Sequence, residues 1–461
     1  MTPDFRNRLA TIDRSGGRIQ LFPAEVRGFW RTRRNWVQGF LILFFLCLPW
    51  IKINGEPTVL VDFQRKVFIF FGLEFWAHDG FYVFFLLAFA AVGLALLTAL
   101  FGRAWCGWAC PQTVFLDGVF RKIETWIEGG HLQRRELQKA PWTYKKILKK
   151  TSKWSLFILF SILITHSFLA YFFSPEKILG MMTQSPIENQ TEFIFILFIN
   201  SLFLFNFAWF REQFCLIVCP YGRIQSILMD SHSLTVHYDT ARGEPRKRKG
   251  VAQLPVQQGA CVDCRKCVQV CPTGIDIRNG LQMECISCTA CIDACDSIMT
   301  KTRQPPGLIA YRSLRGQKPK IFRFRTLFYG AMLLFLSGTF AYFALSRKNI
   351  EVLLLRALDT PYFELSDSSG NRYIANAYRL RIHNQTRSSV SIQLAALLSE
   401  LPKESQVEFP KNEMTLKVDE FRAIPFLVKV PVASLQSKRQ LKIKIQVNDQ
   451  IREADFVSPT F

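Results

Sequence analysis

Five mostly apolar stretches recur along the chain, and each is about long enough to cross a bilayer as a helix. They cover residues 36–51, 81–101, 154–173, 192–210 and 326–345. Crossing a hydrocarbon layer of about 30 Å takes about 20 helical residues. The first stretch is short, and we expect Arg34 and Lys52, which flank it, to snorkel toward the head groups. The pattern therefore predicts an α-helical membrane bundle of five spans.

Lys and Arg residues are distributed unevenly between these spans. Segments 1–35, 102–153 and 211–325 together hold 37 of them, whereas 52–80 and 174–191 together hold 4. Basic loops stay in the cytoplasm. We therefore expect a cytoplasmic N-terminus, and five crossings place residues 346–461 outside.

The formal net charge of +22 raises the question of a nucleic-acid partner. Basic pairs such as Lys145-Lys146 and Lys149-Lys150 lie beside a predicted span. Attraction to anionic lipid head groups explains them, at about 1 kcal/mol per charge. We expect the lipid bilayer, and no nucleic acid, as the partner of these charges.

Eight of the 13 cysteines form two runs with the same spacing, C-x2-C-x2-C-x3-C. The first is Cys261-Val-Asp-Cys264-Arg-Lys-Cys267-Val-Gln-Val-Cys271-Pro272, and the second is Cys285-Ile-Ser-Cys288-Thr-Ala-Cys291-Ile-Asp-Ala-Cys295. This is the pattern of bacterial ferredoxins with two [4Fe–4S] clusters, in which the fourth cysteine of each run binds the opposite cluster. The predicted ligands are Cys261, Cys264, Cys267 and Cys295 for cluster one, and Cys271, Cys285, Cys288 and Cys291 for cluster two.

A pair of zinc sites is the competing interpretation of these cysteines. Zinc ribbons use two C-x2-C hooks and do not need three closely spaced cysteines plus a fourth. The second run has Asp296 where proline is common, which affects a local turn rather than the ligands. The pattern favours a one-electron relay, and its place between the fourth and fifth spans predicts a cytoplasmic cassette.

A shorter motif, C-x3-C-P, occurs twice. Phe101-Gly-Arg-Ala-Trp-Cys106-Gly-Trp-Ala-Cys110-Pro111 recurs 109 residues later as Phe210-Arg-Glu-Gln-Phe-Cys215-Leu-Ile-Val-Cys219-Pro220. Each copy follows the second span of a hairpin, which indicates an internal two-hairpin repeat. If each copy is helical, its two cysteines share one face, and the proline marks the end of the helix.

Two such faces meeting near the repeat axis would present four thiols at the cytoplasmic membrane edge. Soft thiolates suit Cu(I), zinc or iron–sulfur chemistry, so Cys106, Cys110, Cys215 and Cys219 are candidate catalytic and metal-binding residues, with copper as one possible metal. The alternative is that these cysteines only pack between helices. His166 within the third span fits either a satisfied helix contact or a quinone or metal contact.

Beyond the fifth span the hydrophobic period changes to two. Residues 378–382, 414–418, 426–430 and 441–447 mostly alternate between apolar and polar side chains, which is typical of half-buried strands. The last 116 or so residues therefore predict a β-sandwich of immunoglobulin type, without cysteine, that serves as a docking module.

The chain is thus predicted to be a multi-domain membrane protein. Its parts are a basic N-terminal segment (1–35), a four-span bundle with both C-x3-C-P motifs (36–230), a cytoplasmic region (231–325) with the cassette at about 255–303, a fifth transmembrane helix (326–345) and the immunoglobulin-like domain (346–461).

This combination of spans, twin C-x3-C-P motifs, two-cluster cassette and terminal sandwich resembles the CcoG/FixG/RdxA family of cytochrome oxidase accessory proteins. The resemblance implies a bacterial inner-membrane protein that reduces Cu(II) to Cu(I) for assembly of a cbb3-type cytochrome c oxidase. It implies a cytosolic electron donor, and copper chaperones or oxidase subunits as partners of a periplasmic domain. Two alternatives stay open, a quinol-oxidising relay of the NapH kind and a non-catalytic assembly scaffold.

Overall fold

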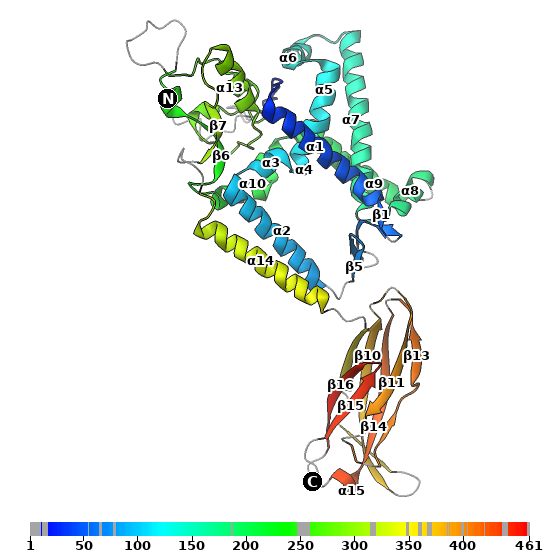
Figure 1. Cartoon of the computed structure of the whole chain (residues 1–461). Coiled ribbons are helices and arrows are strands. Elements are labelled where there is room, and N and C mark those ends of the chain that lie inside the picture. Colours follow the sequence, from blue (N-terminus) through cyan, green and yellow to red (C-terminus); the bar gives the residue numbers. More distant parts are fainter. Residues whose placement is uncertain are drawn as a thin grey trace. The chain divides into compact units, whose positions relative to one another are not determined.

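The computed structural model divides the chain into two compact units, residues 1–340 and 341–461 (Figure 1). It describes residues 11, 17–53, 55–63, 67–76, 80–185, 187, 189–246, 259–313, 320–346, 350–357, 362–366, 371–384, 386, 388–397, 401–402, 404–418, 420–435 and 441–458. Each unit is treated by itself below.

Four helices in the described part of the chain are long and apolar enough to cross a membrane. They contain Phe81–Phe101, Tyr144–Ala170, Gln190–Phe210 and Phe324–Phe343. They belong to α2 (Gly80–Phe101), α7 (Tyr144–Ala170), α9 (Gln190–Phe205) with the π-helical turn η5 (Asn206–Phe210), and α14 (Phe324–Leu345). These four match predicted spans, although α7 begins ten residues before its apolar stretch. The count of five spans stays a prediction.

The first predicted span corresponds to α1 (Phe29–Cys47), a helix of 19 residues followed by η2 (Leu48–Trp50). Its Arg34 is only 1 % exposed. The Arg34 guanidinium lies 2.6 Å from a carboxylate oxygen of Asp117 and donates a 2.7 Å hydrogen bond to the carbonyl of Gly107. The prediction that Arg34 snorkels is therefore wrong, because a buried carboxylate inside the bundle compensates its charge.

A small sheet, which the sequence pattern did not predict, lies between α1 and α2. Its antiparallel strands are β3 (Val59–Asp62), β4 (Val67–Phe70) and β5 (Leu73–Trp76), and β1 (Lys52–Ile53) pairs with β2 (Glu56–Pro57) beside them. The amide of Val61 donates to the carbonyl of Tyr171 at 2.7 Å, which fastens this sheet to the end of α7.

The two C-x3-C-P motifs fold alike, but not as continuous helices. The first spans α3 (Ala104–Trp108) and α4 (Pro111–Phe115), and the second spans the π-helical turn η6 (Phe214–Val218) and α10 (Pro220–Leu228). Cys110 and Cys219 lie between these helices in extended conformations, with φ/ψ of −62°/126° and −69°/111°. The shared helical face was therefore a wrong prediction. A residue before proline avoids the helical region, and each proline starts the next helix.

Further short elements complete the first unit. After α4 come the π-helical turn η4 (Leu116–Phe120), α5 (Arg121–Glu128) and α6 (His131–Lys139), and α8 (Pro175–Thr183) joins α7 to α9. The cassette is framed by an antiparallel pair, β6 (Leu234–Tyr238) and β7 (Ile309–Ser313). Between them lie α11 (Thr240–Gly243), α12 (Lys266–Gln269), the 3-10 helix η7 (Ile277–Asn279) and α13 (Ala290–Lys301).

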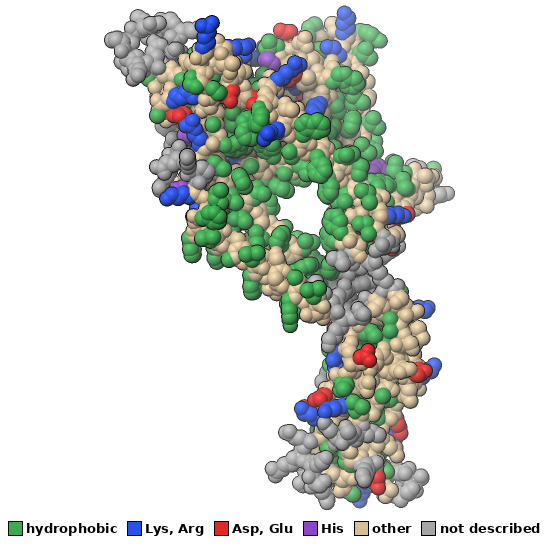
Figure 2. Space-filling view, viewed as in Figure 1, with side chains coloured by type: hydrophobic (Ala, Val, Ile, Leu, Met, Phe, Trp, Pro, Cys, Tyr) green, Lys and Arg blue, Asp and Glu red, His purple; other side chains and the backbone are tan. Residues whose placement is uncertain are grey.

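Charged and apolar side chains separate along this unit. Figure 2 shows Lys and Arg side chains gathered at the end that carries the cassette and α6, and hydrophobic side chains covering α2 and α14. Helices that expose so many apolar side chains are typical of contact with lipid.

The second unit is a sandwich of two antiparallel sheets. One has the order β12 (Gln406–Glu408), β14 (Phe421–Pro431), β10 (Arg372–Asn384) and β8 (Ile350–Arg356), with β9 (Phe363–Ser366) also on β10. The other has the order β13 (Glu413–Leu416), β11 (Val390–Leu397), β15 (Leu441–Val447) and β16 (Gln450–Phe456), and α15 (Val432–Leu435) follows β14.

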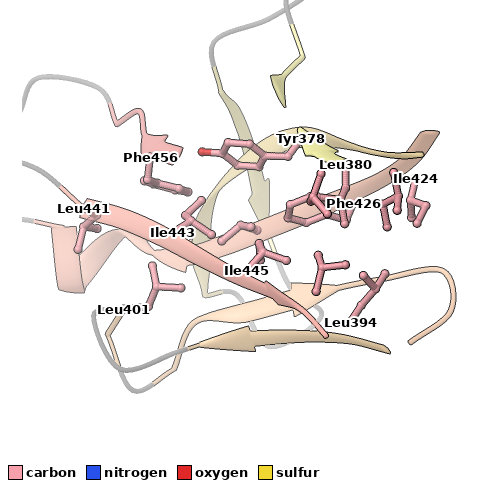
Figure 3. Packing of buried hydrophobic residues seen from close by; sticks show 14 of the residues in the cluster. Tyr378, Leu380, Leu394, Leu401, Ile424, Phe426, Leu441, Ile443, Ile445 and Phe456 are labelled. Atoms are coloured by element: carbon pink, nitrogen blue, oxygen red, sulfur yellow. The ribbon is translucent and has the colours of Figure 1, made fainter. Parts of the chain in front are cut away.

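Alternate residues of both sheets meet in one core. Leu380 and Phe426 of one sheet and Ile443 and Ile445 of the other are all buried there (Figure 3). The phenolic hydroxyl of Tyr378 donates to the carbonyl of Asp455 at 2.9 Å, so its polar end is satisfied. The four predicted strands are confirmed, with β13 ending two residues early.

Candidate functional site

The structure brings the eight cassette cysteines into two groups around two cavities. One is lined by Cys261, Cys264, Cys267 and Cys295, and the other by Cys271, Cys285, Cys288 and Cys291, with Cys267 also on its wall. These groups match the two predicted ligand sets, including the exchange of the fourth cysteine between runs.

The backbone of both runs bends in the same way around these cavities. Asp263 and Arg265 have φ of 51° and 55°, and Ser287 and Thr289, at the same positions of the second run, have φ of 54° and 64°. Non-glycine residues adopt this left-handed conformation rarely, and the cost of about 1–3 kcal/mol each persists where the surroundings require it. The two runs therefore bend around their two cavities in the same way.

Several of the cassette thiols lie in surroundings that favour the neutral form until a metal binds. Burial raises the pKa of Cys267, Cys285 and Cys295 to about 12. Binding of a metal centre displaces such protons, because the thiolate is the ligand.

Asp296, which replaces the proline common after the second run, has a structural explanation. Helix α13 continues from Ala290 to Lys301 through this position. Proline there would lack the amide hydrogen for the helical ladder. The Asp296 carboxylate instead accepts from the amide of Gly307 at 2.8 Å, which fixes the chain entering β7.

The first C-x3-C-P motif lies directly against the second cysteine run. A Cβ atom built on Gly107 would lie 2.4 Å from the carbonyl oxygen of Ile286 and 3.0 Å from the Cα of Cys288. Only a glycine permits this approach. Cys106 packs with Cys288 and Cys291 in one apolar cluster. The motif and the cavity of the second cysteine group are therefore neighbours.

Helix α1 joins the cassette to the bundle from another side. The Asp293 carboxylate of α13 accepts from the amides of Trp30 and Arg31, at 3.2 and 2.7 Å. A carboxylate at these first amides satisfies donors that the helix leaves free and interacts favourably with its dipole. The amide of Ala24 donates to the carbonyl of Gln269 at 2.8 Å, next to the first run.

Each C-x3-C-P motif is held by residues of the other copy. The Cys106 thiol donates to the side-chain oxygen of Gln225, at 3.3 Å, and Gln225 is fully buried in α10. Arg103 donates to the carbonyl of Gly222 at 3.0 Å. Burial raises the pKa of Cys106 to about 11, and burial with the nearby thiols of Cys110 and Cys106 also raises the pKa of Cys215.

The residue after each proline reaches across the repeat. Gln112 exchanges amide hydrogen bonds with Asn206, at 3.1 and 2.6 Å, and donates to the carbonyl of Arg211 at 3.0 Å. Tyr221 shares a 2.7 Å hydrogen bond with Thr98. These reciprocal contacts bring the four candidate thiols to one region, although no three of them converge on a single ion position among the described residues.

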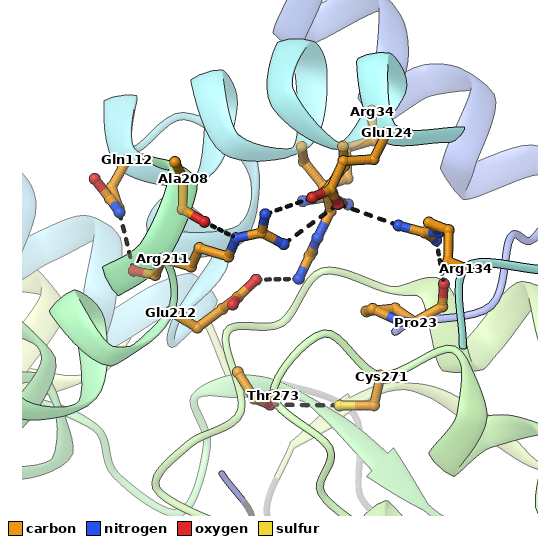
Figure 4. A network of polar contacts seen from close by, with 12 residues as sticks. Pro23, Arg34, Gln112, Glu124, Arg134, Ala208, Arg211, Glu212, Cys271 and Thr273 are labelled. Atoms are coloured by element: carbon orange, nitrogen blue, oxygen red, sulfur yellow. Dashed lines mark hydrogen bonds and ion pairs between the residues drawn. The ribbon is translucent and has the colours of Figure 1, made fainter. Parts of the chain in front are cut away.

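A network of buried ion pairs supports this region (Figure 4). Glu124 is paired with both Arg211 and Arg134, and Glu212 is paired with Arg121. Arg31, Arg34 and Arg121 together surround Asp117, and they hold the pKa of that buried carboxyl well below its usual range. Such pairs fix the relative positions of α1, α5 and the turn before Cys215.

Sequence reasoning missed several residues of this region. Gly107 and Gln225 were not predicted, since their roles depend on contacts between segments far apart in the sequence. An arginine at the edge of an apolar stretch, with an aspartate in the next Lys- and Arg-rich segment (102–153), was the available signal for Arg34 and Asp117.

His166 lies in a separate pocket of about 440 Å³ between α7, α8 and α9. Its Nδ1 atom is 2.8 Å from the carbonyl of Ile162, one helical turn earlier. Met181, Met182 and Asn189 share the pocket wall. One ring nitrogen of His166 is therefore satisfied by a contact within its own helix, and the imidazole lines the pocket.

Family models match three parts of the chain. A 4Fe–4S dicluster domain matches residues 210–314, a 4Fe–4S binding domain matches residues 82–129, and an Ig-like fold found at the C-terminus of FixG matches residues 340–460. The 82–129 match includes the first C-x3-C-P motif.

Curated relatives cover most of the chain. Protein RdxA of Cereibacter sphaeroides is 36 % identical over 82 % of this chain and 82 % of its own length, and protein RdxB of the same organism is 36 % identical over 87 % and 88 %. The nitrogen fixation protein FixG of Rhizobium meliloti is 37 % identical over 64 % of this chain and 58 % of its own length.

Proposed function

The chain belongs to the FixG/RdxA family of iron–sulfur proteins, and we propose that it reduces Cu(II) to Cu(I) at the membrane for assembly of a cbb3-type cytochrome c oxidase. The family and the 4Fe–4S domains establish an iron–sulfur electron-transfer protein with membrane-like helices. The copper step is our proposal, since thiolate ligands favour Cu(I).

In this proposal Cys261, Cys264, Cys267 and Cys295 hold one cluster, and Cys271, Cys285, Cys288 and Cys291 hold the other. The cavities that these groups line support the assignment. Two clusters of this kind, when bound, supply single electrons at low potential. One electron converts one Cu(II) to Cu(I), so no proton or atom has to be transferred.

The observation that carries this proposal is the packing of the Cys106–Gly107 turn on the segment around Cys288. It puts a thiol pair that suits copper next to the cavity of the second cysteine group. Gln225 orients the Cys106 thiol, and Arg34 holds the Gly107 carbonyl. Copper bound by Cys106 and Cys110, with Cys215 and Cys219 close by, would then be within short reach of the electron source.

The orientation belongs to the same proposal. Lys and Arg residues concentrate in segments 1–35, 102–153 and 211–325, and the last of these contains the cassette. Because basic loops stay in the cytoplasm, this distribution supports a cytoplasmic cassette and N-terminus in the bacterial inner membrane. A cytosolic donor would reduce the cassette there. The immunoglobulin-like domain would be periplasmic and would bind copper chaperones or oxidase subunits.

Purified protein with reconstituted clusters tests the copper step. After reduction with dithionite and removal of excess reductant, added Cu(II) should reoxidise the clusters and form Cu(I), detected with a Cu(I)-specific chelator. A Cys106→Ser/Cys110→Ser variant should keep the cluster paramagnetic resonance signals and lose most of the Cu(I) formation. Unchanged Cu(I) formation in this variant would overturn the proposed role of the thiols.

A quinol-oxidising relay is the second candidate, and the pocket that contains His166 favours it. Several wall residues are apolar, as a quinone ring requires, and Asn189 and Glu192 add polar groups. Reduction of the clusters by a quinol, abolished by His166→Ala and insensitive to copper, would support this candidate. If the oxidase still assembles normally when all eight cassette cysteines are replaced, both electron-transfer functions would be excluded and a role as a non-catalytic assembly scaffold would be supported.

A further inference from the structure

A large cavity lies between α1, α5 and the cassette, and no role has been assigned to it above. Its volume is about 560 Å³, within the range of about 300–1,000 Å³ typical of ligand sites. Pro272 and Cys288 line both this cavity and the cavity of the second cysteine group. A molecule bound here would therefore lie beside the proposed second cluster.

The cavity carries an excess of positive charge. Its wall contains six basic side chains, Arg27, Arg31, Arg34, Arg121, Lys122 and Arg134. Two acidic residues of the wall, Glu25 and Asp117, oppose them, and Glu212 and Glu124 pair with Arg121 and Arg134. Because Glu124 is shared with Arg211, six cations against these carboxylates leave an excess of at least two positive charges, and a phosphate monoester carries about two negative charges at pH 7.

Buried donors without partners point to a ligand. Nη2 of Arg34 and Nε of Arg134 are buried and have no hydrogen-bond partner among the described residues. Both side chains are nearly inaccessible, at 1 and 4 % exposure. An unpaired buried donor is costly, so a bound acceptor stabilises such a wall.

The rim of the cavity adds an aromatic surface. Trp126 lines it and is 80 % exposed, and exposed Lys122 precedes it by one helical turn on α5. We propose that the cavity binds a soluble phosphate monoester with an aromatic ring system. Its phosphate accepts from the unpaired donors of Arg34 and Arg134 and lies beside Arg31 and Lys122, and its ring contacts Trp126. The excess of two charges favours a monoester over a phospholipid diester, which carries one.

Binding of flavin mononucleotide to the full-length protein tests this site. The protein carries its clusters and is embedded in nanodiscs of phosphatidylcholine, and binding is followed by flavin fluorescence. We expect saturable binding, competition by inorganic phosphate, and at least tenfold weaker binding of riboflavin, which lacks the phosphate. Lys122→Glu and Arg31→Gln should each weaken flavin mononucleotide binding at least tenfold, and the exposed neighbour variant Arg135→Gln should not change it.

Lys122 is exposed, so its variant keeps the test valid even if Arg31→Gln misfolds, and the cluster resonance signals report folding in every variant. Equal binding of riboflavin and flavin mononucleotide, no binding of either, or no effect of Lys122→Glu would overturn the proposal. Loss of flavin binding in nanodiscs with phosphatidylglycerol would assign the site to lipid and would also overturn it. No copper reduction is needed, so this result does not depend on the proposed function.

Discussion

The two C-x3-C-P copies share their sequence spacing and an extended second cysteine before proline, yet their surroundings differ. Cys106 is followed by Gly107, which lets the turn pack against Ile286 and Cys288 of the cassette. At the same place in the second copy, Cys215 is followed by Leu216. A leucine side chain could not enter the space that Gly107 leaves for a backbone carbonyl.

The hydrogen bonding of the first cysteine also differs between the copies. Gln225 of the second copy accepts from the Cys106 thiol. The residue at the corresponding place of the first copy is Leu116, which cannot accept a hydrogen bond. The repeat thus supplies two similar thiol pairs, of which the first makes the contact with the cassette.

The largest effect is expected from the charge that only the first copy carries. Asp117 is buried among three arginines, and Ser226, exposed, stands at its place in the second copy. Asp117→Asn leaves these arginines without their shared carboxylate and should lower the free energy of unfolding by about 3–5 kcal/mol. Denaturant unfolding in micelles measures this loss, and Ser226→Ala, the matched control, should stay within about 0.5 kcal/mol.

The same carboxylate gives a pH dependence with a defined sign. The folded-state pKa of Asp117 is lowered by the three arginines, so its stabilising contribution is present above the unfolded pKa of about 4 and is lost as the pH falls toward the folded pKa. The stability difference between the native protein and Asp117→Asn should shrink below pH 4. A difference that stays constant down to strong acid would show that Asp117 is not ionised in the fold.

The second effect concerns the contact with the cassette. Gly107→Ala introduces a Cβ that would lie 2.4 Å from the Ile286 carbonyl oxygen, and such overpacking costs about 1–3 kcal/mol. We expect slower reoxidation of the reduced clusters by Cu(II), measured by stopped-flow absorption, with the clusters still bound. Leu216→Ala at the matched position should leave the rate nearly unchanged. Equal effects of both variants would mean that the copies contact the cassette equally.

A smaller effect should follow from Gln225→Leu. This change removes the acceptor of the Cys106 thiol and copies the leucine found at the corresponding position 116. Loss of a residue that orients a metal ligand typically lowers metal affinity by about 10- to 100-fold. We expect a decrease near the low end of this range for Cu(I), measured by competition with a chelator, because one of four candidate thiols is affected. An unchanged Cu(I) affinity of Gln225→Leu would show that Cys106 is not a copper ligand.

Spacing alone predicted the chemistry of the cassette better than it predicted the bundle. The ligand sets follow from short-range rules, because a C-x2-C-x2-C turn can wrap only one cluster, and the alternation of 441–447 follows from the pleat of a strand. The prolines of the C-x3-C-P motifs predicted the helix ends correctly, but each helix already ends before the second cysteine, so the two cysteines do not share a helical face. Arg34 was mispredicted because its partner, Asp117, lies 83 residues away.

The smallest effect should come from the contacts that the residues after the two prolines make across the repeat. Tyr221→Phe removes one hydrogen bond to Thr98, whose hydroxyl still donates to the carbonyl of Leu94 at 2.8 Å, so the cost should be about 1 kcal/mol. Gln112→Leu leaves the half-buried side chain of Asn206 without its amide partner and should cost more, about 1–3 kcal/mol.

Unfolding of both variants in the same micelles, with the clusters intact, compares these two costs directly. Since Tyr221 and Gln112 occupy the same place in the two copies, equal losses would mean that the repeat is energetically symmetric. A larger loss for Gln112→Leu would show that the second copy depends more on the first than the first depends on the second. That direction is expected, because Gln112 also donates to the carbonyl of Arg211, whose guanidinium is paired with Glu124.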